Sequence, residues 1–229
     1  TKDLIVAMAL GNFAVSFGIV YWAEQVLPSS LASILWAVFP LITALVGHVS
    51  MPESRIVGGQ WLSLVVGFFG VVVLMATDVE AVGEEAVFRG LVLLLSPLAS
   101  AVATAYVKQH GAGTSSVLLN RAAMFWGAAI LCVSALVLEG GLPLPSTPKA
   151  LFSIAYLSSF GTVLTFSLYF WVLRQASAVS LSLIAYVTPA IALLVGASLG
   201  EERVSSWTII GLCLILLGCA GVLRRKKGA

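Results

Sequence analysis

The chain has 229 residues, of which 60% are apolar and 10% are charged, and its mean hydropathy is +1.07. A soluble globular domain has about 45–50% apolar and about 25% charged residues, so lipid must be the solvent for much of this chain. The formal net charge of +2 gives no basis for a nucleic-acid partner.

The few charged residues are bunched, and the stretches between them predict the membrane spans. A helix needs about 20 apolar residues to cross about 30 Å of hydrocarbon. Several charge-free stretches approach or exceed that length, so we expect an all-α integral membrane protein. The eight predicted transmembrane helices cover residues 4–22, 30–50, 57–76, 88–107, 116–137, 150–172, 178–199 and 206–223.

The first predicted helix carries polar residues along its length and at its end. Asn12 and Ser16 lie one helical turn apart and share a face. Polar side chains are costly in hydrocarbon and usually face the interior of a bundle or a water-filled cavity. We therefore include both in the predicted substrate-binding set. Trp22 and Glu24 join them, since a carboxylate there can hold a cation or a coupling proton; the competing interpretation of Glu24 is a solvated helix end.

The second predicted helix has Ser33 and Trp36, which we add to the predicted site, and Pro40 near the middle of its span. Proline removes one backbone hydrogen bond and leaves a carbonyl one turn earlier without its donor. Such a bend suits the hinge of an alternating-access transporter, while the competing interpretation is a static kink. In the fourth predicted helix, Ser96, Ser100 and Thr104 are interpreted as residues that bond their own backbone or let helices pack closely, and cavity lining is the alternative.

The sixth predicted helix carries a stripe of hydroxyl groups at helical spacing, and the seventh repeats the serine, aromatic and proline pattern of the second. We interpret both faces as cavity walls; close helix packing is the alternative. The predicted site residues in these two helices are Ser158, Thr162, Thr165, Tyr169, Ser182 and Tyr186, with Pro189 as a second hinge.

The chain resembles itself at a shift of 149 residues. Ser33, Pro40 and a glutamate at position 53 recur as Ser182, Pro189 and a glutamate at position 202. The two prolines lie five predicted helices apart. Five is odd, so the copies cross the membrane in opposite directions, which is the inverted-topology repeat of many secondary transporters.

A five-helix repeat unit predicts the domain organisation. Residues 1–79 are then the last three helices of a first repeat, 87–224 a complete second repeat, and 225–229 a basic cytoplasmic tail. We expect two further helices before Thr1, in a ten-helix, five-plus-five bundle.

Several segments support a family assignment. They are Tyr-Trp-Ala-Glu-Gln at 21–25, Pro-Ser-Ser-Leu-Ala-Ser at 28–33, Phe-Pro-Leu at 39–41, and the series Pro189, Gly200-Glu201-Glu202, Trp207, Gly211 and Gly218. In order and spacing the chain resembles the EamA-type transporters of the drug/metabolite transporter superfamily. The resemblance implies a prokaryotic inner-membrane permease, often an exporter of amino acids, metabolites or amphipathic drugs, whose first two helices help to line the cavity.

We therefore predict a secondary transporter, an exporter of small molecules by alternating access, embedded in a lipid bilayer. One alternative is a sugar-phosphate or nucleotide-sugar exchanger, which would need a basic residue in the middle of a span, and no predicted span has one. Another is a membrane-embedded enzyme or lipid-handling protein, which would need an acid/base or metal cluster. We predict no catalytic residue, metal or cofactor, and leave open whether copies associate.

The Lys and Arg residues predict the orientation. With both ends of the chain in the cytoplasm, nine basic residues lie inside and three, Arg89, Lys149 and Arg203, lie outside. Cytoplasmic loops carry the excess of Lys and Arg, so the nine-to-three division favours this orientation.

A reporter that is active only outside the cytoplasm tests this orientation. Fused after Lys227 it should be silent, and fused in the Asp78–Glu85 loop it should be active, because the basic count places these two points on opposite sides. The reverse pattern would contradict the orientation of every loop.

Overall fold

The structure is a computed structural model that describes residues 2–51, 55–75, 83–141, 146–198 and 206–224. Within these ranges every regular element is a helix. The helices in chain order are α1 (Lys2–Ala7), η1 (Met8–Val15), α2 (Ser16–Glu24), α3 (Ser29–Trp36), α4 (Phe39–Ser50), α5 (Gly58–Met75), α6 (Glu84–Leu93), α7 (Leu95–His110), α8 (Ser116–Leu138), α9 (Pro148–Tyr156), η4 (Leu157–Leu164), α10 (Thr165–Gln175), α11 (Ala178–Ser182), α12 (Ile184–Ser198) and α13 (Ser206–Leu223).

Consecutive helices join into long rods that follow the predicted spans. Six rods in the described ranges are long and apolar enough to cross a membrane: Lys2–Glu24, Leu31–Ser50, Glu84–His110, Ser116–Leu138, Pro148–Gln175 and Ser206–Leu223. Two shorter apolar helices, Gly58–Leu74 and Ala178–Ile191, occupy the third and seventh predicted spans. The all-α prediction is confirmed, while the count of eight spans and the ten-helix frame stay predictions.

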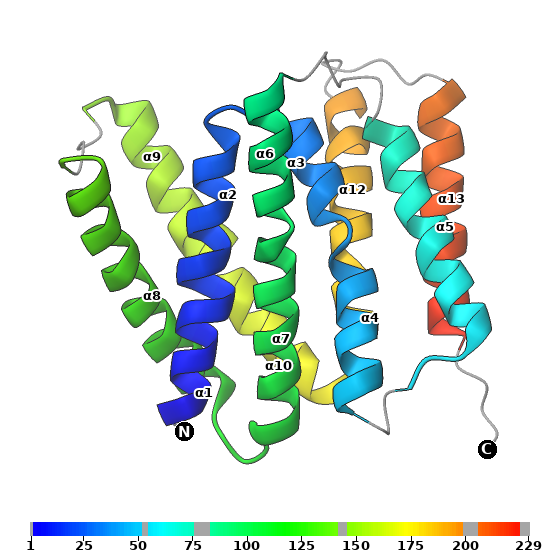
Figure 1. Cartoon of the computed structure of the whole chain (residues 1–229), viewed down its shortest axis with the longest axis horizontal. Coiled ribbons are helices and arrows are strands. Elements are labelled where there is room, and N and C mark those ends of the chain that lie inside the picture. Colours follow the sequence, from blue (N-terminus) through cyan, green and yellow to red (C-terminus); the bar gives the residue numbers. More distant parts are fainter. Residues whose placement is uncertain (1, 52–54, 76–82, 142–145, 199–205, 225–229) are drawn as a thin grey trace.

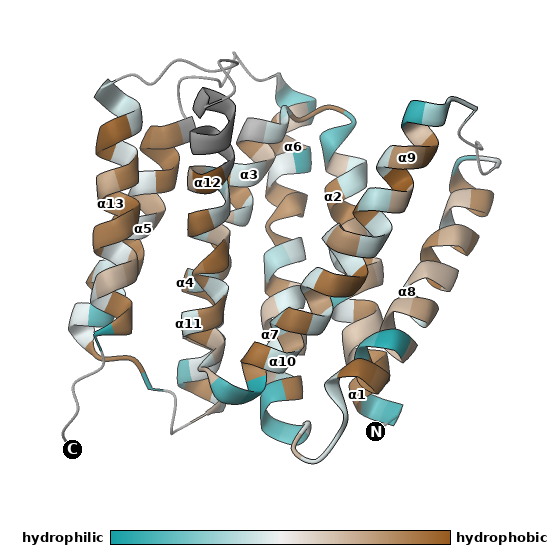
Figure 2. Cartoon of the chain, turned by 180° about the vertical axis from the view of Figure 1, so that it is seen from behind, coloured by the Kyte–Doolittle hydropathy of each residue, from teal (hydrophilic) through white to brown (hydrophobic). Residues whose placement is uncertain are grey.

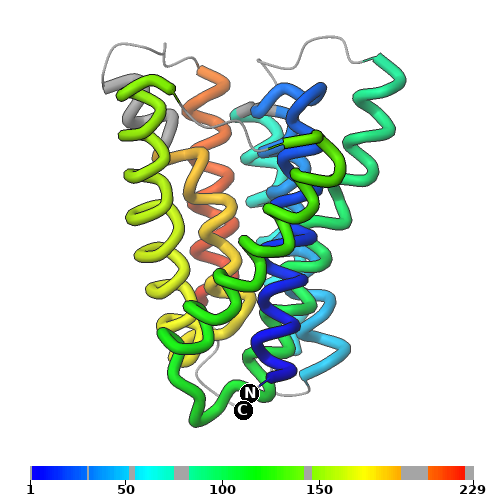
Figure 3. The backbone as a smooth tube through the Cα atoms, turned by 90° about the vertical axis from the view of Figure 1, so that its left-hand side faces the viewer, coloured from blue at the N-terminus to red at the C-terminus, as the bar shows by residue number. Residues whose placement is uncertain are grey.

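The rods lie side by side, and α1 begins at the same end of the bundle at which α13 ends (Figures 1 and 3). Hydrophobic residues dominate the length of the helices, and hydrophilic residues gather mainly at helix ends and in the connections (Figure 2). This distribution is the one expected of helices that cross hydrocarbon. The basic tail 225–229 and the repeat glutamates at 53 and 202 lie outside the described residues.

Two packed groups of helices form the bundle. One joins α4, α5, α12 and α13 around buried residues such as Leu64 and Tyr186. The other joins α1, η1, α7, α8 and α10 around Met8, Leu119 and Phe170. A smaller cluster of α2, α3 and α6 connects them at one end of the bundle.

Helices α5 and α13 pack most closely, through small residues. A methyl group on Gly218 would lie 2.6 Å from Gly67 Cα and 2.7 Å from the Ser63 carbonyl oxygen, and one on Gly70 would lie 2.9 Å from the Gly211 carbonyl oxygen. In lipid, helices associate through such close backbone approach, because no hydrophobic force draws them together. Gly59, which spacing also places on this face, would carry a methyl group with no atom of the described residues within 4 Å.

Two segments of the bundle, η1 and η4, are π-helical rather than α-helical. Both bounds of η4 (Leu157–Leu164) lie 149 residues after those of η1 (Met8–Val15), which is the shift of the sequence repeat. In a π-helix the bonds run to the fifth preceding residue, and such segments are frequent at functional sites. The hydroxyls of Thr162 in η4 and of Thr165 directly after it donate to the carbonyls of Leu157 and Phe160, five residues back.

The two mid-span prolines sit in different local structures. The rod that contains Pro40 is interrupted at residues 37–38, and the proline begins α4 as one of its first residues. Pro189 lies inside the continuous helix α12, and the interruption in its rod falls at Leu183, six residues earlier. The two prolines therefore do not form equal hinges at equivalent positions in this structure.

Gly218→Ala should weaken the α5–α13 contact, because the added methyl group meets backbone atoms that cannot move aside. Overpacking of this kind costs about 1–3 kcal/mol. The measurement is the midpoint of thermal unfolding of the purified protein in detergent, with Gly59→Ala as the control. That control should leave the midpoint unchanged or raise it, since alanine favours a helix and Gly59 has open space. Equal effects of both variants would contradict the packing role.

Candidate functional site: a central cavity

A cavity of about 320 Å³ lies between the two packed groups of helices. Its walls come from η1 and α2, α3 and α4, α7, α10, and α12. The lining residues are Asn12, Ser16, Phe17, Ser33, Trp36, Ala37, Phe39, Ser100, Thr165, Phe166, Tyr169, Ile184, Ala185, Thr188 and Pro189. None of these side chains carries a charge. The volume falls at the lower end of the range of small-molecule sites, about 300–1,000 Å³.

The cavity brings together residues that the sequence proposes from four separate predicted helices. Seven of the proposed site and hinge residues line it: Asn12, Ser16, Ser33, Trp36, Thr165, Tyr169 and Pro189. Their convergence on one cavity is a property of the fold, since Ser33 and Pro189 are 156 positions apart in the chain.

A buried network of hydrogen bonds supports one wall. The Ser16 and Ser96 hydroxyl oxygens are 2.8 Å apart, and Ser96 also donates to the Ser16 carbonyl at 3.1 Å. Ser100 donates to the Ser16 hydroxyl at 3.1 Å, and the Trp36 indole N–H donates to Ser96 at 3.0 Å. Ser96 and Ser100 thus bond to neighbouring helices rather than to their own backbone, and Ser100 also lines the cavity. They link α7 to α2 and α3 and fix the position of the indole.

Aromatic rings form two other parts of the wall. The Phe166 ring contacts Phe13 at 4.9 Å and Phe17 at 6.0 Å between centroids, both edge to face. On the other side, the rings of Trp36 and Phe39 lie 4.9 Å apart. Phe17 and Phe166 are separated by 149 residues, as are Ser16 and Thr165, so positions related by the sequence repeat meet at the cavity.

Tyr186 and Ser182, two proposed site residues, lie away from the cavity. Tyr186 is fully buried, and its hydroxyl donates to the Leu64 carbonyl at 2.9 Å while its ring covers Gly67. Ser182 is also fully buried and donates to the Val179 carbonyl. Tyr186 thus anchors α12 against α5, whereas the Ser182 hydroxyl bonds within α11.

Ser158 and Thr162 also bond to their own helix rather than lining the cavity. Ser158 donates to the Ile154 carbonyl, and Thr162 donates to the Leu157 carbonyl. Both residues lie in segment η4, which, like the preceding helix α9, contains no buried side chain. Of the four-residue stripe in the sixth predicted helix, only Thr165 and Tyr169 reach the cavity. Pro40 is buried beside it, next to the lining residue Phe39.

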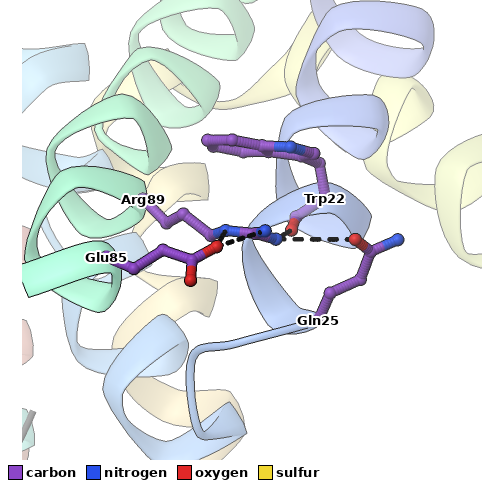
Figure 4. Close-up of polar contacts among 4 residues, drawn as sticks. All are labelled: Trp22, Gln25, Glu85 and Arg89. Carbon is purple, nitrogen blue, oxygen red and sulfur yellow. Dashed lines mark hydrogen bonds and ion pairs between the residues drawn. The ribbon is translucent and has the colours of Figure 1, made fainter. Parts of the chain in front are cut away.

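Trp22 takes part in a polar cluster at the end of α2 (Figure 4). The Arg89 guanidinium donates to the Trp22 carbonyl at 2.5 Å and to Glu85 at 2.7 Å, and it lies 4.6 Å above the Trp22 ring. A contact to the Gln25 side-chain oxygen at 3.5 Å completes the cluster. Arg89 thus binds the Trp22 carbonyl in the last turn of α2 and ties it to α6. Glu24, at the end of α2, is exposed, and neither Trp22 nor Glu24 lines the cavity.

The sequence analysis missed the apolar half of the site. Phenylalanine and alanine residues are so common in membrane helices that their spacing does not separate a cavity wall from a lipid-facing surface. Two of the missed residues could have been found from the sequence, because Phe17 and Phe166 are related by the shift of the sequence repeat. The missed lining residues are Phe17, Ala37, Phe39, Ser100, Phe166, Ile184, Ala185 and Thr188. Among the described residues, no group of three His, Cys, Asp or Glu side chains is close enough to hold a metal ion.

A helical bundle with several membrane-capable rods is typical of a multi-pass membrane protein. Residues 88–224 match the model of the EamA-like transporter family. The chain therefore belongs to that family, as its sequence motifs predict.

Named relatives agree with this assignment. The chain is similar to the uncharacterized transporter YoaV of Bacillus subtilis, with 26% identity over 88% of this chain and 68% of the relative. It is similar to the uncharacterized inner membrane transporter YedA of Escherichia coli K12, with 24% identity over 91% of this chain and 65% of the relative. Protein PecM of Dickeya dadantii is 24% identical over 89% of this chain. The chain thus spans about two thirds of the length of these relatives.

A solved crystal structure shares the fold. It superposes with a TM-score of 0.83 over 96% of this chain and 76% of the other, at 16% sequence identity. At a sequence identity this low, the similarity shows only that the two proteins share a fold.

Proposed function

We propose that the cavity is the substrate site of a secondary transporter, which exports small metabolites, amino acids or amphipathic compounds by alternating access. One observation carries this proposal: the uncharged cavity takes its walls from both parts of the sequence repeat. Residues 1–79 supply Asn12 and Trp36, and residues 87–224 supply Thr165 and Tyr169. Binding sites at the interface of two repeats are typical of secondary transporters.

Two further features support the inverted repeat within this proposal. The π-helical segments η1 and η4 lie 149 residues apart. The α5–α13 contact follows the repeat as well. A nearly equal shift of 148 residues relates Ser63 to Gly211 and Gly70 to Gly218. Gly70 approaches Gly211 and Ser63 approaches Gly218, so each close contact is the repeat image of the other. A twofold axis in the membrane plane would produce this pairing.

The phosphate-exchanger alternative has no support in the cavity. Phosphate recognition uses Arg or Lys side chains in direct contact with the ligand. The cavity lining has neither, and Arg89 in the described structure is engaged with Trp22, Gln25 and Glu85. An enzyme is not favoured either, because the family and its named relatives are transporters.

Replacement of Trp36 tests the role of the cavity. Trp36→Leu removes the largest ring of the wall, and loss of a buried aromatic anchor costs on the order of 2 kcal/mol, that is more than tenfold in affinity. We expect export, or resistance to amphipathic compounds, to fall accordingly in cells with equal membrane levels of the full-length gene product. The matched control is Trp207→Leu, because Trp207 is exposed on α13. Full export by the Trp36 variant would contradict the proposed site.

Replacement of Pro189 tests the hinge. Pro189→Ala restores an N–H donor inside α12, so the helix and its membrane level should be maintained or improved. If alternating access uses the bend, the transport rate should fall well below that of the wild type, since hinge changes act on turnover rather than on folding. Pro40→Ala is the companion variant, at a position where the rod is already interrupted. Unchanged transport by both variants at normal abundance would make the prolines passive kinks.

A further inference from the structure

Within the proposed transport site, we infer that the ligand is an uncharged aromatic molecule with a hydrogen-bond acceptor, which pairs with the Asn12 carboxamide and lies against the Trp36 and Phe166 rings. The inference rests on the proposed function for the role of the site. It goes further by choosing among the substrate classes, and it argues against free amino acids and phosphorylated compounds.

Charge is the first selective property of the cavity. All fifteen lining residues are uncharged, so a carboxylate, phosphate or ammonium group of a ligand would find no counter-charge. An ion inside the membrane is stable only when it is paired or hydrated. An uncharged ligand avoids this cost.

The aromatic walls favour a ring in the ligand. Phe17, Phe166 and Tyr169 come from α2 and α10, and Trp36 and Phe39 come from α3 and α4, so rings face the cavity from two separate parts of the bundle. Aromatic pairs gain about 0.5–1.5 kcal/mol beyond the apolar area that they bury. The Trp36 indole is also fixed by its bond to Ser96, which lowers the entropy lost when a ligand binds against it.

Two residues of the wall, Asn12 and Tyr169, carry a buried polar atom that has no hydrogen-bond partner among the described residues. We assign the acceptor of the ligand to Asn12, because the hydroxyls around it are already engaged. The hydroxyls of Thr165 and Thr188 donate to the carbonyls of Phe160 and Ile184, at 2.7 Å each. Ser100 donates to Ser16, as described above. Each hydroxyl has a single hydrogen, so these groups have no donor left for a ligand.

Asn12 differs from these hydroxyls. Its side chain lines the cavity and is 5% exposed, and its amide nitrogen has no hydrogen-bond partner among the described residues. A buried donor without a partner costs about 1–3 kcal/mol. Rotation of the carboxamide about its last bond exchanges the positions of its nitrogen and oxygen, which lets the N–H₂ group meet an acceptor in the cavity. A carbonyl or ring nitrogen on the ligand supplies that acceptor.

Three indole compounds test the inference, because they share a ring and differ in one group. Indole-3-acetamide is neutral and has an acceptor, indole-3-acetate is an anion at pH 7, and 3-ethylindole is neutral without an acceptor. The full-length protein is placed in lipid nanodiscs, and binding is measured by calorimetry with empty nanodiscs as the reference. We expect saturable binding of the amide, at least about tenfold tighter than that of the acetate.

The variants locate the selective group. Asn12→Leu should reduce the affinity for indole-3-acetamide relative to 3-ethylindole by about three- to tenfold, the effect of one lost hydrogen bond. Asn120→Leu is the control: Asn120 is equally buried, at 2% exposed, but lies on α8 outside the cavity, and its variant should keep the ratio. Trp36→Leu should weaken both neutral compounds.

Opposite results separate this inference from the proposed function. Equal or tighter binding of indole-3-acetate, no saturable binding of the amide, or an unchanged ratio in Asn12→Leu would each overturn the ligand chemistry. Export of an anionic or zwitterionic compound that Trp36→Leu abolishes would keep the transport site and overturn the inference. If the binding ratios follow our expectation while Trp36→Leu cells export normally, the ligand chemistry stands and the proposed transport role of the cavity fails.

Discussion

The structure depends on one constraint: in hydrocarbon, polar groups have to find their hydrogen-bond partners inside the protein. Helices satisfy the backbone, and where the helix departs from α geometry, side chains complete the bonding, as Thr162 in η4 and Thr165 directly after it do. The same constraint explains the serine network of α2 and α7, whose hydroxyls bond one another instead of facing lipid. With polar groups satisfied in this way, helices are free to associate by shape, and the glycine contacts of α5 and α13 are the tightest example.

The cavity is one of the places where this satisfaction is left incomplete. Its walls combine aromatic rings with threonine hydroxyls whose hydrogens are already donated to the protein. The Asn12 amide nitrogen and the Tyr169 hydroxyl remain buried without a partner among the described residues. A wall that is fixed except for these groups can select a ligand by them, because the other contacts depend on shape and ring area. The hydrogen bond from the Trp36 indole to Ser96 fixes this ring before a ligand binds, which also favours a selective site.

The sequence predicts the helices well and the site in part, for physical reasons. Charge-free length fixes where a span lies, so the described rods follow the predicted ranges. Helical spacing gives the face of a residue but not its neighbour, so Ser16 and Tyr186 were equivalent candidates although one lines the cavity and the other bonds to Leu64. Arg89 illustrates the same limit. Its charge marks a loop, but only the folded chain shows that it binds the last turn of α2 and lies above the Trp22 ring.

Divergence between the two proposed repeats bears on how the cavity would work. A strict twofold relation would give both sides the same lining, yet Trp36 corresponds at a shift of 149 to Ala185, and Phe39 corresponds to Thr188. At these two positions the large ring belongs to the first repeat, and the second repeat has a smaller side chain near Pro189. A small wall next to a helix that lacks one backbone hydrogen bond can move with little loss of packing, whereas the indole is held by Ser96. If the proposed hinge operates, α12 is thus the element expected to move, against a fixed wall formed by α3 and α7.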